Sequence, residues 1–434
     1  MSNPIHSTSA KSVLPMLAMR GLATGLCAGC VVGLLRLSHD RAAARVALWL
    51  EEWREVWWTV PIWFGVLVAL VVILRRIVRE EPLISGSGIP QTELALAGRL
   101  SFTWWRVLLA KFLGSWLALF GGLALGREGP SIQMGGAVGA GFHALWRPAA
   151  PHALTGSPYV VAGAVAGLAA AFGAPAAGVL FAFEEMKSRR DTSLIVAACA
   201  SAIGAHLMIR IVFGMGRILP FAGFEAPPLS SFWIVALEGA VFGVLGVGYN
   251  KTLLWLHDRE AGQTLIPDRW RALPPLLLAG CLALFAPLLI GGGESLIIFV
   301  GEHDVALKTL ILLLAFKYLF AQYSTVAAIP GGLLMPILCL GALWGRLWAE
   351  LPVSALAAHG LASGSVQPYV LFGMVSYFAA TVRAPLTGIV LVTEMSGTYT
   401  CLPGSLLAGL IACKVANLLH CPPVYDSLKE RIRL

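Results

Sequence analysis

The chain has 434 residues, of which 58% are hydrophobic and only 12% are charged, and its mean hydropathy is +0.79. A soluble globular chain usually has about 25% charged residues, so this composition excludes an ordinary soluble domain and predicts an all-α polytopic membrane protein. The net charge of +8 does not indicate nucleic-acid binding, because the basic residues form short clusters between apolar segments. These clusters are Arg75, Arg76 and Arg79; Lys187, Arg189 and Arg190; and Lys429, Arg431 and Arg433.

The apolar segments lie at about 15–37, 58–78, 104–125, 131–146, 158–185, 192–215, 230–256, 272–290, 305–322, 330–349, 366–382, 385–397 and 403–420. Several are shorter than the ~20 residues that cross a bilayer, and glycine or proline interrupts many of them. We therefore expect discontinuous helices that meet near the bilayer midplane. The positive-inside rule places the 75–111 stretch and both termini in the cytoplasm, with an outside loop near residues 39–57.

The sequence predicts a cytoplasmic N-terminal segment (1–14), a transmembrane domain (15–428) and a short cytoplasmic tail (429–434). Within the transmembrane domain we expect a first half at about 15–215 and a second half at about 230–425. We expect a multi-pass membrane protein with both termini in the cytoplasm.

The stretch Gly126-Arg127-Glu128-Gly129-Pro130 lies between two long apolar runs. Ionisable groups at membrane depth are costly and are functional by default, although a local ion pair between Arg127 and Glu128 is the alternative. The glycines and the proline predict a backbone break followed by a helix that begins near Pro130. A helix start of this kind directs free N–H groups at an anion, so the stretch predicts an anion site that already contains a carboxylate.

An internal repeat indicates two related halves. Residues 169–184 align with residues 379–394 at an offset of 210, and six positions are identical: Ala169/Ala379, Ala170/Ala380, Ala174/Ala384, Pro175/Pro385, Gly178/Gly388 and Glu184/Glu394. A similar offset of 206 aligns Gly126–Pro130 with Gly332-Leu333-Leu334-Met335-Pro336. Duplicated halves with paired breaks are typical of transporters and channels.

Two further features contain groups that can bind an anion. Gly86-Ser87-Gly88-Ile89-Pro90 predicts either an unwound segment whose Ser87 hydroxyl donates to an anion, or a flexible cytoplasmic turn. Tyr425, after the last apolar segment, is either an interfacial anchor or a phenol donor turned inward. Neither the eight scattered cysteines nor the nine dispersed histidines form a metal-ligand pattern, so we expect no metal site.

Four motifs, in their order along the chain, resemble those of the CLC family of chloride channels and chloride/proton antiporters. They are Gly86–Pro90, Gly126–Pro130, Gly332–Pro336 and Tyr425. The resemblance also includes residues 162–186 and 383–395, and it covers about residues 15–428. It implies two inverted-topology repeat halves and a homodimer in which each subunit has its own anion pathway. Because the chain stops at Leu434 without the cytoplasmic regulatory domain pair of many eukaryotic members, the resemblance also implies a location in the bacterial inner membrane.

The resemblance implies that the hydroxyls of Ser87 and Tyr425 and the backbone N–H groups of Leu333 and Leu334 bind the central anion. Glu128 would be the external gate and proton carrier, and Glu185 would be the inner proton-transfer acid. Glu184, which the repeat pairs with Glu394, has a structural role in this interpretation. Channel members of the family generally lack the inner acid, so Glu185 favours exchange of chloride for protons.

Other functions remain possible at this stage. A passive chloride channel could have the same fold, and the family also includes fluoride/proton antiporters, which generally lack the serine and the tyrosine. Leu334 replaces the phenylalanine usual in the family, which should leave the backbone N–H contact intact. An enzyme is not expected, because an intramembrane serine protease would need a histidine base for Ser87 and no suitable span contains one. We expect no cofactor besides the transported ions.

Overall fold

The computed structural model describes residues 6–51, 56–150, 152–188, 191–221, 224, 226–358 and 366–432. The predicted tail (429–434) and N-terminal segment (1–14) therefore lie partly outside the described residues, as do Arg189, Arg190 and Arg433 of the basic clusters. Within the described ranges the fold is helical. The helices are α1 (His6–Glu51), α2 (Thr59–Glu80), α3 (Ile89–Leu96), α4 (Trp104–Phe120), α5 (Glu128–Trp146), α6 (Pro158–Phe172), α7 (Pro175–Glu184), α8 (Thr192–Leu207), α9 (Phe232–Gly262), α10 (Leu273–Phe285), α11 (Glu294–Glu302), α12 (Leu307–Val326), α13 (Leu334–Trp348), α14 (Ser354–Ala358), α15 (Gln367–Val382), α16 (Pro385–Ser396), α17 (Leu402–Leu418) and α18 (Val424–Glu430).

The apolar helices fall into two length classes, as expected for a membrane protein with discontinuous helices. In the described part of the chain, seven helical segments are long and apolar enough to span a membrane, and they include α1, α2, α9, α12 and α17. By contrast, α6, α7 and α16 are apolar but too short to cross alone. The expectation of discontinuous helices is confirmed.

The two halves repeat one packing pattern. Helix α5 packs on α6 as α13 packs on α15, and α1 packs on α8 as α9 packs on α17. The backbones approach most closely at glycine pairs, where a Cβ on Gly135 would collide with the carbonyl of Gly163 and one on Gly341 with that of Gly373. These pairs are related by the offsets of 206 and 210 found in the sequence, so the duplication is structural as well as sequential.

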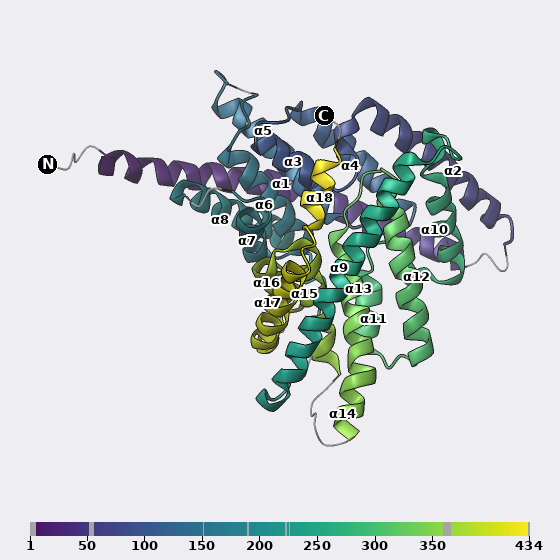
Figure 1. The fold of residues 1–434 in the computed structure, drawn as a ribbon. Coiled ribbons are helices and arrows are strands. Elements are labelled where there is room, and N and C mark those ends of the chain that lie inside the picture. Colours follow the sequence, from purple (N-terminus) through teal and green to yellow (C-terminus); the bar gives the residue numbers. More distant parts are fainter. Residues whose placement is uncertain are drawn as a thin grey trace.

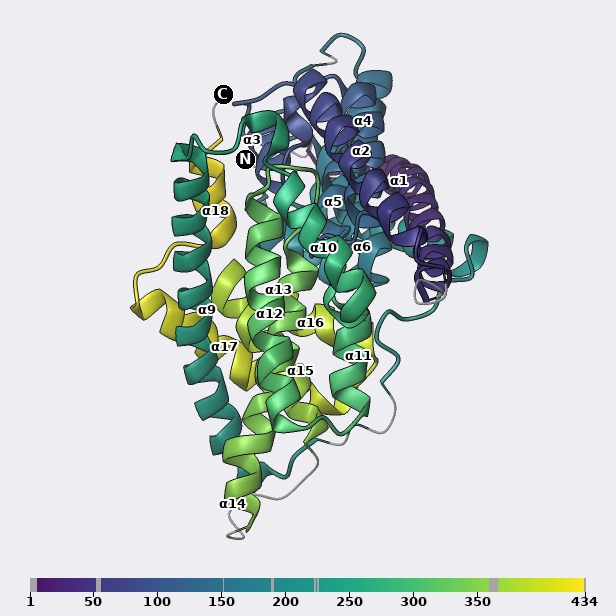
Figure 2. The same cartoon turned by 90° about the vertical axis from the view of Figure 1, so that its right-hand side faces the viewer.

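The halves meet through their short helices. Helix α7 of the first half contacts α16 of the second, and Figure 1 shows the two lying next to each other. The last helix, α18, packs against α3 of the first half and α9 of the second, and Figure 2 shows it beside α9. The ion site predicted from the sequence is therefore built from both halves.

One sequence expectation was wrong. Residues 39–57 were predicted as an outside loop, because charged residues end the apolar run there, but α1 continues to Glu51. The charged residues are compatible with the helix because Asp40 finds a cationic partner inside the protein, as described below. Helix α5 also begins at Glu128, two residues before the predicted start at Pro130.

Candidate ion-transport site

The three glycine-rich breaks are hydrogen-bonded to one another. The amide of Gly126 donates to the carbonyl of Gly332 and the amide of Gly332 donates back to Gly126, both at 2.7 Å. The amide of Gly86 donates to Ile329 at 3.1 Å, and Gly331 donates to the carbonyl of Gly86 at 3.0 Å. Because these bonds satisfy the unwound backbone inside the protein, the breaks can exist at membrane depth.

The break before α3 requires glycine. Gly86 and Gly88 have φ angles of 66° and 87°, in the left-handed region that side chains disfavour. A Cβ on Gly129 would approach the Cβ of Ser87 at 2.8 Å and its carbonyl oxygen at 2.9 Å. The first break and the start of α5 are therefore in direct contact, which excludes the alternative of a free cytoplasmic turn for Ser87.

Each break leads into a helix that has proline in its first turn. Pro90 is the second residue of α3, and Pro130 and Pro336 are the third residues of α5 and α13. Proline lacks the N–H that would have no intrahelical acceptor at these positions, and it fixes a helical φ. These prolines start the helices within the protein interior, so the helices present their positive ends there.

The four anion-binding candidates are all buried. The side chain of Ser87 is 7% exposed, and its oxygen accepts a hydrogen bond from the amide of Ile89 at 3.3 Å. Tyr425 is fully buried and its hydroxyl has no partner among the described residues, so its phenol is turned inward. The amides of Leu333 and Leu334 also donate to no acceptor in the described part of the chain. Unpaired buried donors of this kind are rare and suit a bound anion.

The carboxylate of Glu128 lies at the inner end of a cavity. Glu128 is fully buried, and its carboxylate has no side-chain partner among the described residues but lies close to the backbone amides of Glu128 and Met335, at the starts of α5 and α13. The side chain folds back over Gly126, where a Cβ would collide with its carboxylate. A cavity of about 660 Å³ extends from Glu128 along the C-terminal part of α1, the ends of α4 and α10, and residues of segments 122–128 and 287–295.

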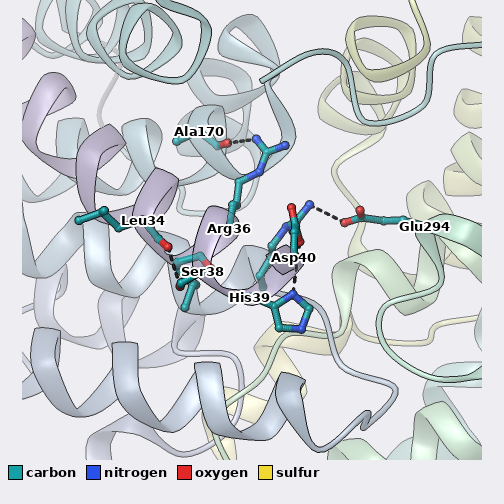
Figure 3. A network of polar contacts seen from close by, with 9 residues as sticks. Leu34, Arg36, Ser38, His39, Asp40, Ala170 and Glu294 are labelled. Carbon is teal, nitrogen blue, oxygen red and sulfur yellow. Dashed lines mark hydrogen bonds and ion pairs between the residues drawn. The ribbon is translucent and has the colours of Figure 1, made fainter. Parts of the chain in front are cut away.

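Arg127 does not form the local ion pair considered as the alternative. Its guanidinium binds Asp40 of α1 at 2.9 Å and Glu294 of α11 at 2.8 Å. Figure 3 shows both acids approaching from different elements, with Glu294 opposite Asp40. The arginine therefore leaves the adjacent carboxylate of Glu128 unpaired.

Glu185 lies at the other end of the site, immediately after α7. Its side chain is 5% exposed and lies within electrostatic reach of Glu93 and of Asp426 and Lys429 on α18. Lys429 binds Glu93 at 2.5 Å and Asp426 at 2.9 Å, and Lys187 binds Asp426 at 2.8 Å. Tyr425 is within electrostatic reach of both Glu185 and Glu128. Tyr425 is thus near both the predicted inner acid and the predicted gate.

The model of the voltage gated chloride channel family matches residues 64–417. The chain belongs to this family. Its relatives include proteins named H(+)/Cl(−) exchange transporter ClcA. The relative from Vibrio campbellii is 35% identical over 93% of this chain and 87% of its own length, and the one from Klebsiella pneumoniae is 31% identical over 97% and 89%.

Solved structures of the family share this fold. A slow cyanobacterial Cl⁻/H⁺ antiporter aligns with a TM-score of 0.86 and 29% identity over 95% of this chain and 97% of its own. A CLC-type fluoride/proton antiporter aligns with a TM-score of 0.70 but only 19% identity over 95% of this chain and 98% of its own, which shows the fold alone. The predicted inverted-repeat helical fold is confirmed.

Sequence reasoning missed two buried lysines, one of which binds carbonyl groups of the break before α3 and the other those of the segment before α11. Lys111 donates to the carbonyls of Ile84 and Gly86 at 2.8 and 2.7 Å. Lys317, 206 residues later, donates to those of Leu289 and Gly291 at 2.9 and 2.7 Å. The shared offset of 206 could have revealed them, because it is the offset that relates the two breaks.

In the described part of the chain, no group of three or more His, Cys, Asp or Glu residues could hold a metal ion. The buried charged groups of the site are instead paired with one another, or are left unpaired where an anion or a proton could bind.

Proposed function

We propose that this protein exchanges chloride for protons across a membrane as a secondary active transporter. The observation that carries the proposal is the juxtaposition of unpaired donors with an unpaired carboxylate at one interior point. Donors attract an anion, whereas the carboxylate of Glu128 competes with that anion unless it binds a proton.

The central anion in this proposal is held by the hydroxyls of Ser87 and Tyr425 and by the amides of Leu333 and Leu334. These donors are buried and come from the break before α3, the start of α13 and α18. The hydroxyl of Tyr425 has no partner among the described residues. Leu334 acts through its backbone, so the replacement of the family's usual phenylalanine does not remove a ligand.

Coupling follows from electrostatic repulsion. A chloride ion close to Glu128 disfavours the ionised carboxylate and so promotes its protonation. Because linkage is reciprocal, protonation of Glu128 must promote anion binding to the same extent. Glu185 takes up the proton on the cytoplasmic side, where the Lys429 and Lys187 ion pairs hold α18 in place. No cofactor is required besides the transported ions.

In its membrane setting, we expect a homodimer with one pathway in each subunit, both termini in the cytoplasm and a location in the bacterial inner membrane. The basic residues in the last turns of α2 (Arg75, Arg76 and Arg79) and at the end of α18 (Lys429 and Arg431) support the orientation by the positive-inside rule. Chemical cross-linking in native membranes would test the dimer, and accessibility of single cysteines added to each terminus would test the orientation.

The decisive experiment is proton uptake driven by a chloride gradient in proteoliposomes, with the voltage clamped near the proton equilibrium potential by potassium and valinomycin. We expect uphill proton movement. Chloride flux without proton movement would instead identify a passive chloride channel, and absence of chloride flux would direct the same assay to fluoride.

A further inference from the structure

Two acids from opposite halves of the repeat hold the arginine that precedes the gate. Asp40 Oδ1 lies 2.9 Å from Nη1 of Arg127, and Glu294 Oε1 lies 2.8 Å from Nη2. The arginine side chain is only 6% exposed, whereas those of Asp40 and Glu294 are 53% and 34% exposed. Both acids thus line the cavity that reaches Glu128 while they bind the buried guanidinium of Arg127.

Several charged side chains near Glu128 balance one another in charge. Besides Arg127, Asp40 and Glu294, α1 contributes Arg36, which donates to the carbonyl of Ala170 at 2.8 Å, and His39, which contacts Asp40 at 3.3 Å (Figure 3). Tyr425 of α18 is also near enough to interact electrostatically with Glu128. The two guanidinium groups and the two outer acids balance in charge, so the net charge of the cluster depends on Glu128 and His39.

We propose that Asp40 and Glu294 are positioning residues of the external gate and act on Glu128 through Arg127. This inference rests on the proposed function of Glu128 as the gate. An arginine without its two acids would be a buried cation one residue from a buried carboxylate, and the two would pair because neither can be solvated. By occupying both Nη groups, Asp40 and Glu294 leave Glu128 free to bind a proton.

The proposal predicts a specific change in pH dependence. Asp40→Asn and Glu294→Gln each remove one negative charge but keep an oxygen that can accept from Arg127. The remaining positive charge then favours the ionised gate, so more acid is needed to protonate it. We expect the external pH at half-maximal exchange to move down by about one unit in each variant and further in the double variant.

A second buried arginine on α13 provides a matched control. Arg346 binds Asp304 at 3.3 Å and Glu350 at 2.6 Å, and its side chain is 4% exposed, but its acids do not line the cavity that reaches Glu128. Asp304→Asn should therefore leave the pH profile unchanged. Asp40→Glu and Glu294→Asp keep the charge and should restore the wild-type profile.

The test measures chloride-driven proton transport in proteoliposomes against external pH for all of these variants. Profiles of Asp40→Asn and Glu294→Gln that coincide with that of Asp304→Asn would overturn the proposal, as would conservative variants that shift as far as the neutral ones. Wild-type protein that moves no protons would refute the exchange function itself, so the two failures are distinguishable.

Discussion

Glu184, at the end of α7, caps the start of α16, and Glu394, on α16, caps the start of α7, across the interface of the two halves. Glu184 Oε2 accepts from the amide of Thr387 at 2.6 Å at the start of α16, and Glu394 Oε2 accepts from the amide of Ala177 at 2.9 Å at the start of α7. A carboxylate at a helix N-terminus satisfies free N–H groups and interacts favourably with the helix dipole. The repeat therefore pairs these acids for a structural reason.

The caps predict a symmetric loss of stability. Replacing either acid by alanine leaves buried or half-buried amides without an acceptor, so each variant should lose about 1–2 kcal/mol of folding stability. Thermal unfolding in detergent, followed by intrinsic fluorescence, would measure the loss. If only Glu184→Ala were destabilised, the two caps would not be equivalent.

The gate is tested by Glu128→Gln and Glu128→Ala. Both remove the group that binds the proton and competes with chloride, so chloride flux should persist while proton transport is abolished. Simultaneous recording of chloride and proton fluxes in proteoliposomes would show this. Proton pumping at the wild-type rate would remove Glu128 from the mechanism.

The inner acid is tested by Glu185→Gln, which keeps the shape of the side chain but cannot exchange a proton at neutral pH. We expect coupled proton movement to be lost and chloride flux to remain, because Glu185 contacts none of the proposed anion ligands through a hydrogen bond in the described part of the chain. Glu430→Gln, an exposed acid at the end of α18, is the control. Intact coupling in Glu185→Gln would assign proton entry to another residue.

The sequence predicted local features of the site better than distant ones. Glycine and proline restrict the backbone where they occur, so the breaks before α3, α5 and α13 could be located from residue type and spacing alone. The partners of Arg127 could not, because Asp40 and Glu294 lie 87 and 167 residues away along the chain. The outside loop predicted near residues 39–57 failed for a similar reason, because the partner of Asp40 that suits it to a helix inside the protein is equally distant in the sequence.

The ion pairs of Asp426 with Lys187 and Lys429 predict how low pH affects the stability contributed by α18. Although partial burial opposes the charge, hydrogen bonds from Lys187 and Lys429 hold the pKa of Asp426 below its usual value. Since the folded-state pKa is lowered, the ion pairs stabilise the fold above the unfolded pKa of about 3.9 and lose this effect as pH falls through the folded-state value. Asp426→Asn should therefore be less stable than wild type at neutral pH.

The stability difference between Asp426→Asn and wild type should then disappear in acid. Unfolding temperatures of both proteins, measured from pH 7 to pH 3 in the same detergent, would test the sign. Because Tyr425 precedes Asp426 on α18, chloride binding should weaken in the variant at neutral pH, where the ion pairs normally hold the helix. A stability difference that grew on acidification would mean that Asp426 does not stabilise α18 through its charged form.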